Sequence, residues 1–189
     1  MNTTNKRIIL ASGSPRRKEL LKNLEINFEV ITLSIDETMD DSLSLDERLK
    51  NLAYRKAEAV FKSCEDSLVI GADTIVVIDG KILGKPKNRQ DAYDILKTLS
   101  GRTHEVKTGV AIITKEKSDV FISTTKVNFA QMSDDEIYRY IETSEPMDKA
   151  GAYGIQGYGS KFITSIDGDY YTVMGLPINM LYNYLRNYL

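Results

Sequence analysis

The chain has 189 residues, and its 25 Lys and Arg against 27 Asp and Glu give a formal net charge of −2, which argues against a general nucleic-acid binder. It contains one His and one Cys, which excludes both an intramolecular disulfide and a structural zinc site of Cys and His ligands. A Ser–His–Asp triad or a Cys–His pair would need His104 or Cys64, so we expect carboxylates, Lys, Arg, hydroxyls, backbone amides or a bound ion to act instead.

The first half of the chain alternates predicted strands and helices. Ser14 and Pro15 are typical of a helix N-cap and first helical position, and Ser44 with Glu47 forms a capping box. The Asp-Gly pair at 79–80 is typical of a hairpin turn. The predicted elements, in order, are strand 8–11, a helix from 15 to about 24, strand 28–33, helix 45–61, strands 68–70 and 74–78, strand 81–83 and helix 89–99.

The second half continues the mixed pattern. Two β-branched runs are followed by a capping box of Ser133 and Glu136, and four of the chain's 12 Gly lie between 151 and 159. The predicted elements are strands 106–114 and 120–129, a helix after Ser133, a Gly-rich loop, a hairpin of 162–166 and 170–173, and a final helix starting at Pro177. We predict a mixed α/β fold and find no sharp domain boundary within 1–189.

The segment 8–21, IILASGSPRRKELL, is the first candidate binding site. A helix that starts at Ser14 and Pro15 leaves free backbone amides facing whatever lies beyond the strand. Arg16 and Arg17 add two cations there, which favours a polyphosphate or another anion. The alternative is an ordinary capped helix with two solvated Arg side chains.

Asp73 interrupts an apolar stretch in GADTIV, residues 71–76. A carboxylate within a strand is costly unless it is paired or binds a cation, although an acid at an edge or turn is the alternative. Lys85 lies in LGKP, residues 83–86, where Gly84 and Pro86 constrain the backbone. A single loop Lys is commonly just solvated, so only its closeness in sequence to Asp73 makes it a candidate.

Three further side chains are candidates. Lys56 falls inside the apolar stripe of the second predicted helix, where it either snorkels to water or reaches a phosphate. Glu37, in the acidic segment 35–41, either belongs to a solvated turn or completes a Mg²⁺ site, because this ion takes one or two carboxylates together with substrate phosphates. Gln156 lies in the Gly-rich loop, and its amide suits reading a nucleobase edge. We expect His104 to be a surface or capping residue and assign no function to Cys64.

Together these segments resemble the Maf family of nucleoside triphosphate pyrophosphatases over essentially the whole chain. The matching segments are LASGSPRRKELL (10–21), GADTIV (71–76), LGKP (83–86), LSGRTHEV (99–106), EPMDKAGAYGIQG (145–157) and GDYYTVMGLP (168–177). The resemblance implies a fold like that of inosine triphosphate pyrophosphatases, an elongated mixed sheet with flanking helices and two lobes around a central cleft in one domain. It also implies hydrolysis of a nucleoside triphosphate at the α–β phosphoanhydride bond, with a divalent cation, Mg²⁺ or Mn²⁺.

Within the family, the dTTP/UTP subgroup is implied by three residues thought to read the base: Arg16, Thr74 and Gln156. The remaining implied roles are assigned to residues that the preceding paragraphs single out. Asp73 would act as general base and bind the metal with Glu37, while Ser12, Gly13, Ser14, Arg17, Lys56 and Lys85 would hold the triphosphate.

The alternative function is a non-catalytic nucleotide-binding regulator of septum formation. The expected partner is the nucleotide, with no nucleic acid, because we find no clustered basic face outside the phosphate site. No membrane partner is expected either, because no apolar run approaches the roughly 20 residues that span a bilayer. The single Cys fits a cytoplasmic location. Oligomeric state stays open, with a homodimer among the options.

Overall fold

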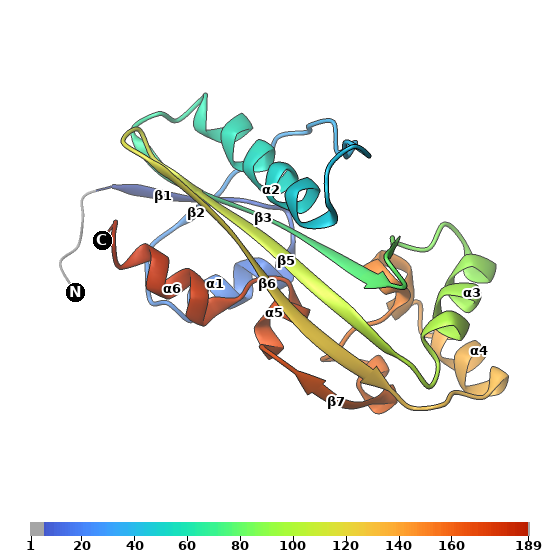
Figure 1. Ribbon diagram of the computed structural model, residues 1–189. Coiled ribbons are helices and arrows are strands. Elements are labelled where there is room, and N and C mark those ends of the chain that lie inside the picture. The colour runs from blue at the N-terminus through green and yellow to red at the C-terminus, as the bar shows by residue number, and fades with distance from the viewer. Residues whose placement is uncertain (1–5, 189) are drawn as a thin grey trace. The chain divides into compact units, whose positions relative to one another are not determined.

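The computed structural model describes residues 6–188, which form a seven-stranded mixed sheet with flanking helices (Figure 1). The strands are β1 (Arg7–Ala11), β2 (Glu29–Val30), β3 (Ser67–Ile78), β4 (Lys81–Leu83), β5 (Thr103–Ile113), β6 (Ser118–Phe129) and β7 (Ile163–Asp167). The α-helices are α1 (Pro15–Lys22), α2 (Leu45–Phe61), α3 (Arg89–Leu99), α4 (Asp134–Glu142), α5 (Tyr170–Met174) and α6 (Ile178–Leu185). The 3₁₀ turns are η1 (Glu145–Asp148), η2 (Ala150–Ala152) and η3 (Tyr158–Phe162).

The strand order is β2-β1-β3-β5-β6-β7, with β4 paired to β3. β1 runs parallel to β2 and β3, whereas β4 and β7 are antiparallel to β3 and β6. The predicted mixed α/β fold with flanking helices is therefore confirmed. In the described part of the chain, no helix is both long and apolar enough to cross a bilayer.

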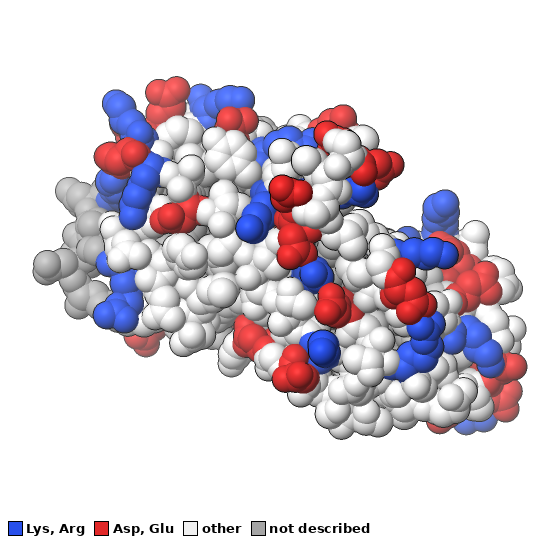
Figure 2. Space-filling view, in the orientation of Figure 1, with Lys and Arg blue, Asp and Glu red and all other residues white. Residues whose placement is uncertain are grey.

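The chain divides into two compact units, and the boundary falls inside β3. Unit 1 contains the residues up to Asp73, Thr108–Ser123 and the residues from Gly175 onward. Unit 2 contains Thr74–Lys107 and Thr124–Met174. Lys and Arg lie interspersed with Asp and Glu over the face drawn in Figure 2, in keeping with the near-balanced net charge.

Unit 1 is built around α2, which packs on β1 and β3 (Figure 1). Gly71 makes this packing close, because a Cβ there would lie 2.6 Å from the Ala53 carbonyl oxygen and 2.7 Å from the Ala57 nitrogen. The two predicted strands 68–70 and 74–78 are in fact one strand, Ser67–Ile78. Gly71 serves the contact with α2, and the strand continues through GAD without a break.

Unit 2 has its own core, in which α3 and α4 pack together over a cluster that includes Leu96, Val127 and Ile137. The predicted Asp79-Gly80 turn is confirmed, because both residues have positive φ, 50° and 73°, as a type I′ hairpin requires. Val76 of β3 then pairs with Leu83 of β4.

Local capping signals are also confirmed. Ser14 caps α1 with Pro15 in its first turn. The capping boxes that open α2 and α4 form with both reciprocal hydrogen bonds, from Ser44 and from Ser133. These predictions hold because a cap depends on residues only three positions apart.

The predicted hairpin near the C-terminus is wrong in its second arm. Ile163–Asp167 is a strand paired with β6, but Tyr170–Met174 is the helix α5. The Asp169 carboxylate accepts hydrogen bonds from the backbone nitrogens of Tyr171 and Thr172, both at 3.1 Å. Asp169 therefore acts as a helix cap, a role that Asp takes as readily as a turn role. The strand predicted at 28–33 is also shorter, Glu29–Val30.

Candidate active site

The turn from β1 into α1 presents the start of a helix at the carboxyl end of a parallel strand. Ser14 lies at the N-cap, and its Oγ accepts from the Arg17 nitrogen at 3.5 Å. Ser12 is buried, and its Oγ accepts from the Ser14 nitrogen at 3.4 Å, whereas Gly13 between them is exposed. The amides of this turn lie at the positive end of the α1 dipole, an arrangement that attracts anions.

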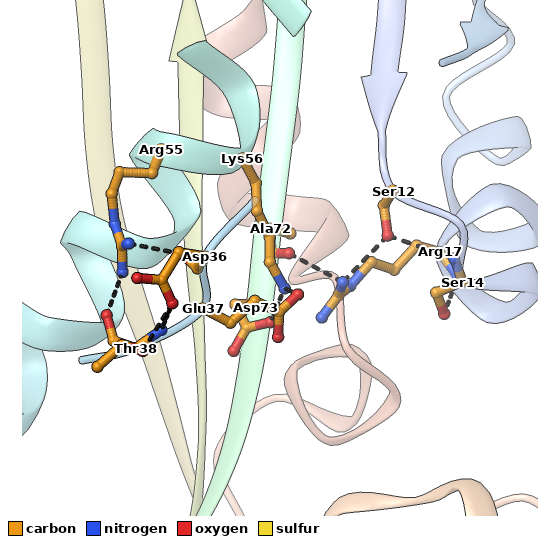
Figure 3. Close-up of polar contacts among 10 residues, drawn as sticks. All are labelled: Ser12, Ser14, Arg17, Asp36, Glu37, Thr38, Arg55, Lys56, Ala72 and Asp73. Carbon is orange, nitrogen blue, oxygen red and sulfur yellow. Dashed lines mark hydrogen bonds and ion pairs between the residues drawn. The ribbon is translucent and has the colours of Figure 1, made fainter. Parts of the chain in front are cut away.

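Arg17 links this turn to two other segments of unit 1. Its Nη1 donates to Ser12 Oγ at 3.1 Å and to the Ala72 carbonyl oxygen at 2.9 Å (Figure 3). Its Nε donates to the Gly175 carbonyl oxygen at 2.8 Å. Burial lowers the pKa of Arg17, and the charge of Asp73 opposes that shift. The guanidinium therefore lies within the electrostatic reach of Asp73, next to the α1 start.

Lys56 lies between two carboxylates. Its Nζ is 2.6 Å from Asp73 Oδ1 and 2.9 Å from Glu37 Oε1 (Figure 3). The side chains of Lys56 and Asp73 are 17% and 16% exposed, whereas that of Glu37 is 63% exposed. Lys56 and Asp73 each interrupt an apolar pattern in the sequence, and the ion pair between them accounts for both. The pair offsets the cost of placing each charge away from water.

Arg55 holds the loop that carries Glu37. Its Nη1 donates to the Asp36 carbonyl oxygen and its Nη2 to the Thr38 carbonyl oxygen, both at 2.7 Å. The Asp36 Oδ1 also accepts from the Thr38 nitrogen at 2.9 Å, which closes a turn around Glu37 (Figure 3). Sequence reasoning missed Arg55, although its position next to Lys56 on the same helix was a usable signal.

Three of the predicted residues lie in unit 2. Thr74 follows Asp73 in β3 and is half-buried, whereas Lys85 and Gln156 are exposed. Lys85 forms no ion pair with any residue in 6–188. The Gly84 carbonyl oxygen accepts from the Gly151 nitrogen at 3.1 Å, so the loop of Lys85 is joined to the Gly-rich segment.

The structure therefore groups the predicted residues by unit. In unit 1 it brings together Lys56, Glu37 and Asp73 in one cluster, and Arg17 with Ser12 and Ser14 in a second. The predicted residues in unit 1 are Ser12, Gly13, Ser14, Arg16, Arg17, Glu37, Lys56 and Asp73, and those in unit 2 are Thr74, Lys85 and Gln156.

His104 is not the surface or capping residue that we expected. It is 2% exposed, and its Nε2 shares a 2.7 Å hydrogen bond with the Tyr153 hydroxyl. Its ring packs edge-on against Phe129 and Tyr153, with centroids 5.0 and 5.3 Å away. Burial lowers the pKa of His104 to about 4, so the ring is neutral at pH 7. It belongs to the core of unit 2.

A family model described as Maf-like protein matches residues 7–188. The chain belongs to the Maf family. It is 50% identical over 183 residues to a protein named dTTP/UTP pyrophosphatase from Bacillus cereus (strain G9842), a match that covers 97% of this Maf chain and 96% of the relative. A protein of the same name from Bacillus cytotoxicus (strain DSM 22905 / CIP 110041 / 391-98 / NVH 391-98) is also 50% identical, with the same coverage.

Among solved structures, this Maf chain is similar to the Ham1 protein of Staphylococcus aureus. The TM-score is 0.54 at 19% sequence identity, and the match covers 97% of this chain and 100% of the other. At that identity the likeness concerns the fold. It supports the mixed sheet described above as a shared architecture.

Proposed function

We propose that this Maf protein hydrolyses dTTP and UTP to the nucleoside monophosphate and pyrophosphate. The observation that carries the proposal is the cluster of Lys56, Asp73 and Glu37, which places two carboxylates and a cation in unit 1. The names of the relatives support the choice of substrate. A nucleotide-binding regulator without catalysis has no need of a partly buried carboxylate such as Asp73, so the regulator is the less favoured function.

The proposed reaction breaks the α–β phosphoanhydride bond. A water molecule attacks the α-phosphorus, pyrophosphate leaves, and Asp73 accepts the proton of the attacking water. The amides of Ser12, Gly13 and Ser14, together with Arg17, stabilise negative charge on the phosphates. Lys56 and Lys85 supply two further cations for the triphosphate.

A divalent cation fits two of these residues. The carboxylates of Glu37 and Asp73 would supply the oxygen ligands for Mg²⁺ or Mn²⁺. Both carboxylates already contact a cation, the Lys56 ammonium. Within residues 6–188 no group of three or more His, Cys, Asp or Glu is suitably placed for a metal. Two carboxylates suffice for Mg²⁺, which takes its remaining ligands from water and phosphates. When bound, the ion would neutralise charge on the triphosphate.

We assign base recognition to Arg16, Thr74 and Gln156. The Gln156 amide offers one acceptor and two donors, as a pyrimidine edge requires. Its exposed position in the Gly-rich segment leaves it accessible to a ligand. The Gln156→Ala variant should therefore lose more activity on dTTP than on GTP, whereas equal losses on both would assign Gln156 a structural role.

The experiment that tests the activity measures pyrophosphate release from a panel of nucleoside triphosphates with Mg²⁺ or Mn²⁺. We expect release from dTTP and UTP, and a loss of about 10²–10⁴-fold in the Asp73→Asn variant. Asp79→Asn is the matched control, because Asp79 lies in an exposed turn and pairs with Arg102. Orthophosphate as the product would mean cleavage of the β–γ bond and would refute the assignment. A homodimer and a cytoplasmic location stay predictions.

A further inference from the structure

Glu145 is the hub of a hydrogen-bond network in unit 2. Its Oε1 accepts from the Tyr140 hydroxyl at 2.7 Å and from the Gly159 nitrogen at 3.1 Å, and its Oε2 accepts from the Tyr158 nitrogen at 2.8 Å. The Tyr140 hydroxyl in turn accepts from the Gly154 nitrogen at 3.1 Å. One carboxylate and one hydroxyl therefore hold both ends of the segment 154–159.

Gln156 lies in the middle of that segment and is exposed. The residue after it is Gly157, and a Cβ there would overlap the Glu145 carboxylate, so a larger residue would displace that carboxylate. A Cβ at Gly159 would likewise lie 2.6 Å from the Tyr140 hydroxyl oxygen. The backbone around Gln156 thus packs directly on Glu145 and Tyr140, so the Gln156 amide is presented from a backbone fixed on both sides.

The network requires a charged carboxylate. Burial alone would raise the pKa of Glu145, but the hydrogen bonds from Tyr140, Tyr158 and Gly159 and the charge of Lys149 lower it. Lys149 Nζ also donates to the Glu145 carbonyl oxygen at 2.8 Å. A carboxylate has enough acceptor sites for three donors. A Gln amide has only one oxygen, and its NH₂ group would face a Tyr hydroxyl or a backbone N–H that already donates.

We propose that Glu145 is a positioning residue for base recognition, which acts by fixing the segment 154–159 so that Gln156 meets the nucleobase in one orientation. This inference rests on the proposed function, in which Gln156 reads the pyrimidine. Glu145 itself touches no reacting atom. Its effect is on the choice between nucleotides, because Asp73, Lys56 and Glu37 belong to the other unit.

The first test is independent of catalysis. Amide hydrogen exchange is compared for the wild type, Glu145→Gln and the control Glu142→Gln, which removes an exposed ion pair to Arg89 from the preceding helix α4. We expect exchange at residues 154–159 to become about tenfold faster or more in Glu145→Gln only, because hydrogen bonds to a charged acceptor are lost. Unchanged exchange in this segment would overturn the proposal.

The second test is kinetic and uses a double-mutant cycle. In Glu145→Gln the ratio of kcat/KM for UTP to that for GTP should fall about tenfold, mainly through KM for UTP. In a Gln156→Ala background the same substitution should leave that ratio unchanged. A loss that is equal for both nucleotides, or an undiminished loss in the Gln156→Ala background, would mean that Glu145 is merely structural.

A third variant keeps the test decisive if Glu145→Gln does not fold. Tyr140→Phe removes one hydroxyl, and with it one donor to Glu145 and the acceptor for Gly154. Tyr140→Phe should also speed amide exchange at residues 154–159 and lower the UTP-to-GTP ratio of kcat/KM, each by a smaller factor than Glu145→Gln. If neither quantity changed, the proposal would be overturned. Failure of the wild type to release pyrophosphate from any nucleotide would instead refute the proposed function, and the exchange data would still decide whether Glu145 holds the segment.

Discussion

The substitution Gly71→Ala tests how packing sets the distances in the Lys56 cluster. A Cβ at Gly71 would lie 2.6 Å from the Ala53 carbonyl oxygen, 2.7 Å from the Ala57 nitrogen and 2.8 Å from the Ala57 Cβ. Ordinary contacts begin near 3.4 Å, and none of these atoms can rotate away, because two belong to the α2 backbone and the third is a Cβ bonded directly to it. Helix α2 must therefore move away from β3 by several tenths of an ångström.

That movement should reduce both stability and activity. Overpacking of a well-packed core costs about 1–3 kcal/mol. For a chain of this length each kcal/mol lowers the melting temperature by about 2–4 °C. Lys56 precedes Ala57 on α2 and Asp73 follows Gly71 by two residues on β3, so their 2.6 Å contact lengthens as the helix moves. We expect kcat to fall as well, because the proposed site depends on that contact.

Thermal unfolding and pyrophosphate release measure the two effects. Gly84→Ala is the control for stability, because a Cβ there has no neighbouring atom within 4 Å. It should change the free energy of unfolding by no more than about 0.5 kcal/mol. A Gly71→Ala protein with the melting temperature and kcat of the wild type would refute the argument that this contact fixes α2.

Three other predictions concern separate parts of the chain. Arg55→Gln releases the carbonyls beside Glu37 and should raise the Mg²⁺ concentration for half-maximal activity about tenfold; an unchanged metal dependence would contradict it. Ser133→Ala removes the α4 cap and should cost about 1 kcal/mol, seen as a lower urea midpoint. Because the pKa of His104 is about 4 when folded and near 6.5 when unfolded, the unfolded state takes up the proton, and the free energy of unfolding should fall between pH 6.5 and 4. His104→Gln should weaken this dependence, and equal pH slopes in the two proteins would contradict the explanation.

Local signals predicted the start of helices and turns well. Ser14, Ser44 and Ser133 cap helices as expected, because each cap is decided by residues three positions away. Asp169 shows the limit of such signals, since the same residue types favour both a hairpin turn and a helix cap. The Asp169 carbonyl oxygen also accepts a hydrogen bond from Thr125 Oγ1 of β6 at 2.9 Å, a contact 44 residues away that no local signal shows.

His104 shows a signal that sequence reasoning passed over. Burial alternates over the first five residues of β5, where His104 and Val106 are buried while Thr103 is exposed. The strand was predicted to begin at 106, so the period of two was not extended back to His104. Its polar neighbours in the sequence suggested a surface position, but neighbours in a strand point to opposite faces.

The candidate site was predictable residue by residue but not as a set of pairs. Lys56 and Asp73 each stand out because each interrupts an apolar pattern. No local rule joins a helix residue to a strand residue 17 positions later, and their 2.6 Å contact comes from the packing of α2 on β3. Glu37 enters through the loop that Arg55 holds, which only the three-dimensional structure reveals.

Two consecutive residues of helix α2 therefore bind two different parts of the site. Successive residues of a helix point about 100° apart, so Arg55 reaches the loop backbone while Lys56 reaches the carboxylates of Glu37 and Asp73. The contacts of Arg55 and Lys56 both depend on the close packing of α2 on β3 at Gly71. A change in that contact moves the loop and the ammonium together relative to Asp73, which is why a substitution with no polar atom is expected to alter the proposed chemistry.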